Sequence, residues 1–313
     1  MINSTEKDGS LQNHKLFYLD IRLNNLCNLS CRTCSEISSS VWAIENGRED
    51  FLFYPGKHNG DYYNQIIEHI DNVKSIYFAG GEPLIQKEHY ELLEELISRN
   101  RTECPLRYNT NLTKLVYNKK NVLDYWSKFK KIWVMVSVDG NHSNLEYWRN
   151  GTNYGIFLKN LKEVKKLNNI FLGINYTLSW PNSFNFFKTH KELVENKLID
   201  VSNFNHHFLS YPTYYSIDIL PNFKKQKLKF ELENYIDWLS SFKEYDLSNK
   251  ISNILFLLEK LDNINEDQSD IELYKFACET KHLDTIRKQN FWEIYPEHLD
   301  IKEYIETKLK FKF

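Results

Sequence analysis

Residues 17–34 read FYLDIRLNNLCNLSCRTC, an alternating apolar run that ends in three closely spaced cysteines, Cys27, Cys31 and Cys34. The chain has five cysteines in 313 residues, so three within eight positions form a local motif rather than an effect of composition. The alternation over 17–23 predicts a half-buried strand, with the cysteines in the loop that follows. Three thiolates select zinc, copper(I) or an iron–sulfur cluster and leave one coordination position open. Because structural zinc sites are closed by four ligands, the open set indicates a metal centre that does chemistry.

A second motif, Gly80-Gly81-Glu82-Pro83, follows the apolar run 76–79 about one βα unit downstream. Glycines at a strand end let the backbone approach a ligand closely, and an acidic side chain can hold an ammonium group. This segment is therefore a second candidate binding element.

The C-x3-C-x2-C spacing together with the GGEP segment resembles the radical S-adenosylmethionine (SAM) superfamily. The resemblance implies that Cys27, Cys31 and Cys34 bind a [4Fe–4S] cluster whose fourth iron takes the amino and carboxylate groups of SAM. It implies that the GGEP segment receives the SAM amino group. It also implies an enzyme that takes an electron from a flavodoxin or ferredoxin, cleaves SAM to a 5′-deoxyadenosyl radical and abstracts a hydrogen atom from a substrate.

Short β-rich runs alternate with helical patterns, which is typical of parallel strands joined by crossover helices. The expected strands are 17–23, 75–78, 106–109, 132–138, 170–177 and 203–209. The expected helices between them are 38–46, 61–70, 87–98, 122–128, 154–167 and 184–196. By resemblance these six units form an α/β fold, the partial (β/α)6 TIM-like barrel of the radical SAM type. In such barrels the chemistry gathers at the carboxyl ends of the strands.

The chain is expected to divide into an N-terminal tail over 1–15, a radical SAM core barrel over 16–210 and a C-terminal extension over 211–313. Helical periodicity dominates the extension, which we expect to be mostly helical. The expected helices there are 224–241, 251–261, 271–288 and 298–309.

Polar residues at other strand ends match further positions of the superfamily. The additional predicted SAM contacts are Thr33, Asn109, Asn111, Ser137, Asp139, Arg149 and Asn175. Two positions depart from the usual pattern: Leu112 stands in place of a common glycine, and Thr33 in place of an aromatic residue that packs on the adenine. For the strand-end residues, the alternatives are turn formers, helix caps or surface charges.

Two cysteines lie outside the loop, Cys104 and Cys278. The stretch from Leu283 to Glu297 resembles the tail of a twitch or SPASM-like group, in which such extensions bind auxiliary clusters through extra cysteines. Two cysteines are too few, so we expect a single cluster. Cys278 is a candidate hydrogen-atom donor, with packing in the core as the alternative, and Cys104 is expected to be structural.

The chain is 42% hydrophobic and 26% charged, with a formal net charge of −2. This composition predicts a globular enzyme without bulk attraction to nucleic acid or membrane. No apolar run approaches the roughly 18 residues of a membrane helix, and residues 1–15 lack the apolar core of a signal peptide. We therefore expect a cytoplasmic, reducing compartment, which suits free thiols.

Two substrate classes remain open: a peptide, as in maturases of the twitch and SPASM type, and a small metabolite. A different hypothesis is a non-catalytic barrel that binds zinc or only a substrate. An electron carrier resembling a ferredoxin would need a fourth cluster ligand, which the loop lacks.

Overall fold

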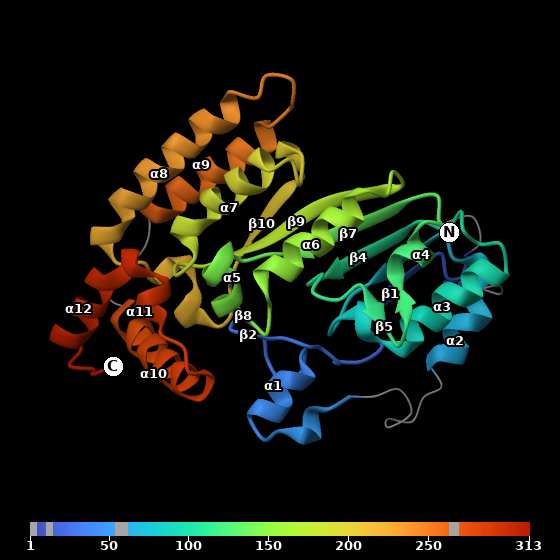
Figure 1. Ribbon diagram of the computed structural model, residues 1–313, viewed down its shortest axis with the longest axis horizontal. Helices are drawn as coiled ribbons and strands as arrows, with labels where there is room; N and C mark the ends of the chain where they lie inside the picture. Colours follow the sequence, from blue (N-terminus) through green and yellow to red (C-terminus); the bar gives the residue numbers. More distant parts are fainter. Residues whose placement is uncertain (1–4, 11–14, 54–61, 263–268) are drawn as a thin grey trace. The chain divides into compact units, whose positions relative to one another are not determined.

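A computed structural model describes residues 5–10, 15–53, 62–262 and 269–313. Its central sheet has six parallel strands in the order β1-β3-β4-β7-β9-β10 (Figure 1). The strands are β1 Tyr18–Ile21, β3 Ser75–Phe78, β4 Leu106–Thr110, β7 Ile132–Ser137, β9 Ile170–Leu178 and β10 Phe204–Phe208. All six lie where the apolar alternation predicted them, with ends moved by at most two residues. The predicted partial (β/α)6 barrel is confirmed.

Helices connect successive strands, as the parallel arrangement requires. Those that the sequence predicted are α1 Ser40–Glu45, α2 Tyr62–His69, α3 Lys87–Ser98, α4 Val122–Trp126, α6 Tyr154–Lys165 and α7 Ser183–Glu195. Several short features went unpredicted. Helix α5, His142–Trp148, is one of them. Two antiparallel strand pairs are others, β2 Ser30–Cys31 with β8 Arg149–Asn150 and β5 Val116–Tyr117 with β6 Lys120–Asn121, because strands of two residues cannot show a period.

The described chain forms two compact units. Unit 1 comprises 1–28, 35–135 and 163–171, and unit 2 comprises 29–34, 136–162 and 172–313. In unit 1, Phe78 of β3 stacks on Tyr108 of β4 with ring centroids 4.9 Å apart, and His89 of α3 packs edge-on against both. These contacts mark the side of β3 and β4 that the helices cover.

The two faces of each strand are unequally covered. In β7, Ile132, Val134 and Val136 are buried, whereas the alternate residues are only half-buried. In β9, Tyr176 packs on Phe186 of α7, so that its neighbours in the strand lie on the opposite face. We call the half-buried face of these strands the uncovered face.

The C-terminal part of unit 2 is helical, as the sequence predicted. Its helices are α8 Asn222–Ser240, α9 Ser248–Asp262, α10 Ser269–Arg287, α11 Phe291–Ile294 and α12 Leu299–Thr307. Helices α8 and α9 lie side by side (Figure 1). An aromatic cluster anchors α10. The ring centroid of Phe276 lies 4.6 Å from that of Trp180 and 5.0 Å from that of Phe291.

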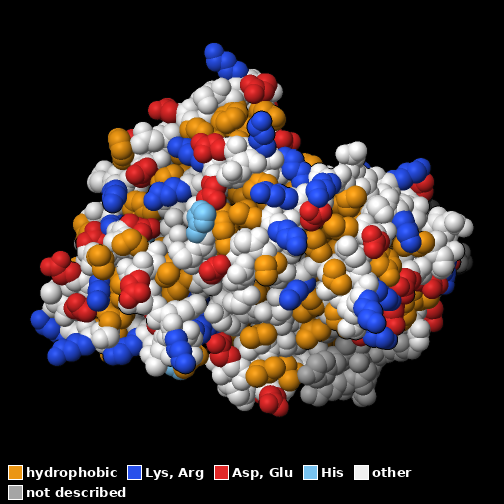
Figure 2. Space-filling view, viewed as in Figure 1, with side chains coloured by type: hydrophobic (Ala, Val, Ile, Leu, Met, Phe, Trp, Pro, Cys, Tyr) orange, Lys and Arg blue, Asp and Glu red, His pale blue; other side chains and the backbone are white. Residues whose placement is uncertain are grey.

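Side chains of both charge signs are interspersed on the face drawn in Figure 2. This distribution agrees with the formal net charge of −2. No helix in the described parts of the chain is both long enough and apolar enough to cross a membrane.

We expect Phe276→Ala to lower the free energy of unfolding by about 3–5 kcal/mol, because it removes a fully buried ring from the aromatic cluster. The matched control is Tyr274→Ala on the same helix, where the ring is 48% exposed and the loss should stay below about 1 kcal/mol. Urea unfolding of both variants measures the difference. Equal losses would show that this cluster does not anchor α10.

Candidate functional site

The GGEP motif lies directly against the chain that precedes the first cysteine. Gly81 has a positive φ of 49°, and a Cβ built on it would lie 2.3 Å from the carbonyl oxygen of Leu26. Gly80 also has a positive φ, and its added Cβ would meet Arg22 at 2.8 Å. Only glycine combines this backbone conformation with this close approach. The approach lets the Glu82 N–H donate to the Leu26 carbonyl at 2.8 Å.

Glu82 is a buried carboxylate that ties two strand ends together. One oxygen accepts from the Thr110 hydroxyl at 2.6 Å and from the Leu84 N–H at 3.1 Å, and the other accepts from the Asn111 N–H at 2.7 Å. A carboxylate offers about four acceptor positions, so these three donors occupy most of its capacity. Pro83 follows at the start of the short 3₁₀ helix Pro83–Ile85 and is buried. The motif thus has a structural function that the sequence did not indicate.

Residues of unit 1 also hold the backbone around Cys27. The Cys27 N–H donates to the Ser40 hydroxyl at 3.1 Å, and this hydroxyl donates back to the Cys27 carbonyl at 3.2 Å. The next residue, Asn28, donates to Thr113 at 2.8 Å and accepts from the Asn111 amide at 3.2 Å. The start of the cysteine loop is therefore fixed by α1 and by the segment after β4.

Asn111 forms the tight turn that follows β4. Its side-chain oxygen accepts from the Thr113 N–H at 2.9 Å, which is the geometry of an Asx turn. Leu112, in the position where the superfamily often has glycine, adopts a positive φ of 53°. Leucine rarely adopts this conformation, and the bonds of Glu82 and Asn111 on either side maintain it.

In unit 2, Arg149 links the second cysteine to a buried carboxylate. Its Nη2 lies 2.8 Å from the Oδ2 of Asp139, and its Nη1 donates to the Cys31 Sγ at 3.8 Å. Asp139 Oδ1 also accepts from the Thr177 N–H at 2.8 Å. The pairing of β2 with β8 places Cys31 opposite Arg149 and so creates this contact. Both oxygens of Asp139 are thus bonded within the protein.

The electrostatics around Arg149 favour thiolates. Burial by itself lowers the pKa of Arg149, but the charges of Asp139, Cys31 and Cys34 raise it above its usual value. Burial raises the pKa of Asp139, and Arg149 and the Thr177 N–H oppose that effect. A permanent cation beside two cysteines stabilises their deprotonated, metal-binding form.

Three predicted contacts lie on strands with their side chains half-buried: Asn109, Ser137 and Asn175. In β4, β7 and β9 they alternate with buried residues that lie on the covered face. They therefore belong to the uncovered face. Thr33 is half-buried in the cysteine loop.

The two remaining cysteines differ in exposure. Cys278 on α10 is exposed, so the alternative that it packs in the core is wrong. Cys104 is buried just before β4, as expected for a structural residue, and burial raises its pKa.

One residue of the cysteine loop escaped prediction. Arg32 is almost fully buried and pairs with Asp284 of α10. Its position between Cys31 and Cys34 could have indicated a buried ion pair, because a charged residue between two metal ligands has little freedom to reach solvent. Thr110, which donates to Glu82, was also missed although it stands between the two predicted residues Asn109 and Asn111.

Comparison with known proteins gives one match at the level of a family. The family model of the radical SAM superfamily matches residues 21–179, just over half of the chain. An uncharacterized protein of Methanocaldococcus jannaschii is 28% identical over 138 residues, which is 43% of each chain.

The chain is also similar to solved structures. The structure of anSMEcpe with bound AdoMet has a TM-score of 0.50 and 20% identity, over 72% of this chain and 58% of that chain. Streptococcus suis SuiB bound to S-adenosylmethionine has a TM-score of 0.47 and 19% identity, over 72% of this chain and 45% of that chain. The chain thus spans about half the length of these relatives.

The matched region includes all three loop cysteines, the GGEP segment and the strand ends as far as β9. The chain therefore belongs to the radical SAM superfamily of enzymes, whose cofactors are a [4Fe–4S] cluster and SAM.

Proposed function

We propose that this chain binds one [4Fe–4S] cluster through Cys27, Cys31 and Cys34, cleaves SAM reductively and abstracts a hydrogen atom from a peptide or a small metabolite. The observation that carries the proposal is the hydrogen bond from the Glu82 N–H to the Leu26 carbonyl. The GGEP motif meets the chain immediately before the first cysteine there, although Leu26 and Glu82 are more than fifty residues apart in the sequence. Contact between the two candidate ligand motifs is expected of a shared cofactor site.

The chemistry of the residues present suits these cofactors. Three thiols on one loop supply soft ligands, and the Arg149 guanidinium lies beside Cys31. The Nε of Arg149 is buried and lacks a hydrogen-bond partner among the described residues, so it is available to an anionic group such as the SAM carboxylate. A cluster held by Cys27, Cys31 and Cys34 would supply the electron for reductive cleavage of the sulfonium C–S bond of SAM to methionine and a 5′-deoxyadenosyl radical.

The protein's own part is to hold and orient the reacting groups. We assign Gly80, Gly81 and Glu82 to the SAM amino group, and the Thr33 backbone to the adenine. Asn109, Ser137 and Asn175 on the uncovered strand face, with Asn111 nearby in sequence, are assigned to SAM or substrate. Asp139 holds Arg149 through their 2.8 Å ion pair.

We further propose that 16–210 forms the catalytic core and 211–313 a twitch-like extension without an auxiliary cluster. A flavodoxin or ferredoxin in the cytoplasm would supply the electron. Cys278 stays our candidate hydrogen-atom donor; it is exposed on α10.

We expect Cys31→Ala to abolish cluster binding, because two thiolates cannot hold a cluster that three secure. The matched control is Cys104→Ala, which removes a buried thiol outside the loop. Anaerobic reconstitution followed by iron and sulfide analysis measures the loss. A full cluster in Cys31→Ala would contradict the ligand assignment. Zinc in place of iron in the wild-type chain would favour the metal-binding module instead.

We expect Glu82→Gln to keep the cluster but to weaken SAM binding by about tenfold, which corresponds to about 1.4 kcal/mol. The amide has one acceptor oxygen where the carboxylate has two, so one of the three protein donors loses its partner and the motif shifts. Glu103→Gln makes the same change on a side chain that is 65% exposed and should bind SAM like the wild type.

Calorimetric titration of the reconstituted proteins with SAM measures this effect. The assignment of Glu82 to the SAM site fails if its variant binds SAM with unchanged affinity.

A further inference from the structure

Arg32 is the buried centre of the loop that carries Cys31 and Cys34. Its side chain is 1% exposed, and its Nη2 contacts the carboxylate of Asp284 and the side-chain oxygen of Gln289, the latter at 3.0 Å. Burial by itself lowers the pKa of Arg32, but Tyr147, Tyr215 and Asp284 raise it. The loop thus buries a permanent charge whose counter-charge lies 252 residues away in sequence.

Asp284 collects three donors from separate segments. Its Oδ1 accepts from Arg32 and from the Tyr147 hydroxyl, at 2.8 Å for the latter. Its Oδ2 accepts from the Phe291 N–H at 2.7 Å, at the first residue of α11. One carboxylate therefore joins the cysteine loop, the end of α5 and the start of α11.

The surroundings of Arg32 leave its loop little freedom. The Arg32 N–H donates to the Trp148 carbonyl at 2.9 Å, and its guanidinium lies 3.8 Å above the ring of Tyr147. Gln289 also donates to Asn150 at 3.2 Å, which is the residue paired with Ser30 in the β2–β8 ladder. The backbone of the loop is thus bonded to residues 148–150, and the Arg32 side chain is bonded to Asp284 and Gln289.

A buried ion pair is a weak source of stability, because desolvation of the two charges offsets their attraction. Loss of one partner, however, leaves an uncompensated charge in the interior. The pair therefore acts chiefly through geometry, since Arg32 reaches the Asp284 carboxylate only when the loop has one conformation.

We propose that Asp284 is a positioning residue for the metal centre. Acting through Arg32, it fixes residues 29–34 and so the direction in which the Cys31 and Cys34 thiolates point. The C-terminal helix α10 is thereby part of the cluster site although it supplies no ligand. The identity of the cluster rests on the proposed function, whereas the fixing of the loop does not.

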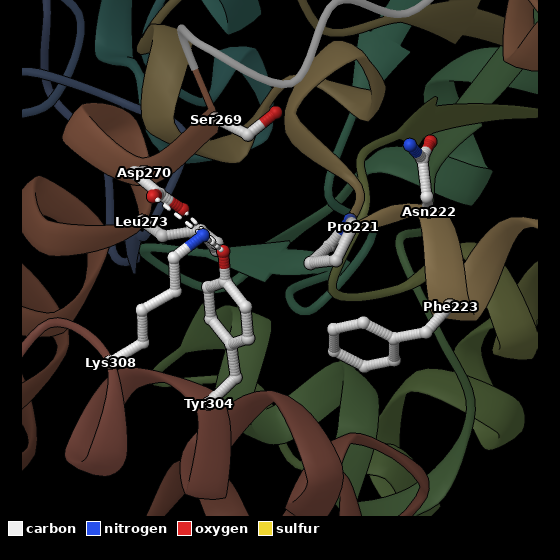
Figure 3. A pocket seen from close by; sticks show the side chains of 8 residues that line it. All are labelled: Pro221, Asn222, Phe223, Ser269, Asp270, Leu273, Tyr304 and Lys308. Carbon is white, nitrogen blue, oxygen red and sulfur yellow. Dashed lines mark hydrogen bonds and ion pairs between the residues drawn. The ribbon is translucent and has the colours of Figure 1, made fainter.

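The test compares Asp284→Asn with Asp270→Asn, the same change in the same helix. Asp270 accepts from the Tyr304 hydroxyl at 2.7 Å and lies 3.2 Å from Lys308 Nζ, beside a pocket of about 450 Å³ (Figure 3). Its side chain is 34% exposed, so that water compensates the loss of its charge.

Hydrogen exchange of the metal-free chain measures the loop directly. We expect the amides of residues 29–34 to exchange at least about tenfold faster in Asp284→Asn, because the Arg32 guanidinium loses its charged partner and the loop then opens more often. Asp270→Asn should leave their exchange unchanged. Unchanged protection of this segment in Asp284→Asn would overturn the proposal.

A second measurement uses the reconstituted proteins. We expect Asp284→Asn to lose iron to a chelator at least about tenfold faster than Asp270→Asn and to show an altered electron paramagnetic resonance spectrum with SAM. Asp284→Glu keeps the charge, so its rate of iron loss and its electron paramagnetic resonance spectrum should be closer to those of the wild type. In an Arg32→Met background, Asp284→Asn should add no further loss, because its effect passes through Arg32. A full additional loss there would exclude that route.

If Asp284→Asn does not fold, the double variant Arg32→Met with Asp284→Leu replaces both charges by apolar groups, which a buried site tolerates. A folded double variant with fast exchange over 29–34 supports the proposal, and a protected loop contradicts it. A wild-type chain that takes up no iron would contradict the proposed function and leave the exchange result intact.

Discussion

The missing side chain at Gly81 is the constraint on which the predicted cofactor site depends. The carbonyl oxygen of Leu26 occupies the space that a Cβ would take, at 2.3 Å from its ideal position. This close approach lets the Glu82 N–H donate a hydrogen bond to the Leu26 carbonyl. The Glu82 side-chain carboxylate accepts hydrogen bonds from Thr110 and Asn111 at the end of β4. Any larger residue at position 81 would separate the two motifs before a ligand could bind.

The rest of the cysteine loop depends on two buried arginines. Arg149 lies beside Cys31 and is held by Asp139, whereas Arg32 is held by Asp284. Both guanidinium groups are planar, permanently charged and able to form several directed bonds at once. Lysine in either place would keep the charge but lose the fork of donors. The directed hydrogen bonds of the two arginines therefore matter to the loop as much as their charge does.

Sequence patterns predicted the six strands, the crossover helices between them and the helical C-terminal part, because burial of one face imposes a regular period on each element. They failed for β2 and β8, since two residues cannot show a period. They also did not indicate that Asp139 and Arg149, which are both predicted ligand contacts, form an ion pair with each other. Nothing in the local sequence distinguishes a carboxylate that binds a ligand from one that pairs with another side chain of the protein. The link from Arg32 to Asp284 was out of reach for a similar reason, because single-sequence patterns carry little information on pairs 252 residues apart.

That separation has a consequence for biosynthesis. Asp284 follows Arg32 of the cysteine loop by 252 residues, and the N–H of Phe291 follows later still. During translation the three thiols leave the ribosome long before the carboxylate that orders their loop has been made. Domains of this size fold largely as units, and long-range contacts form late. We therefore expect a nascent chain that still lacks Asp284 to hold iron and sulfide less firmly than one in which Asp284 has been made, so that a ribosome-stalled product would lose metal faster.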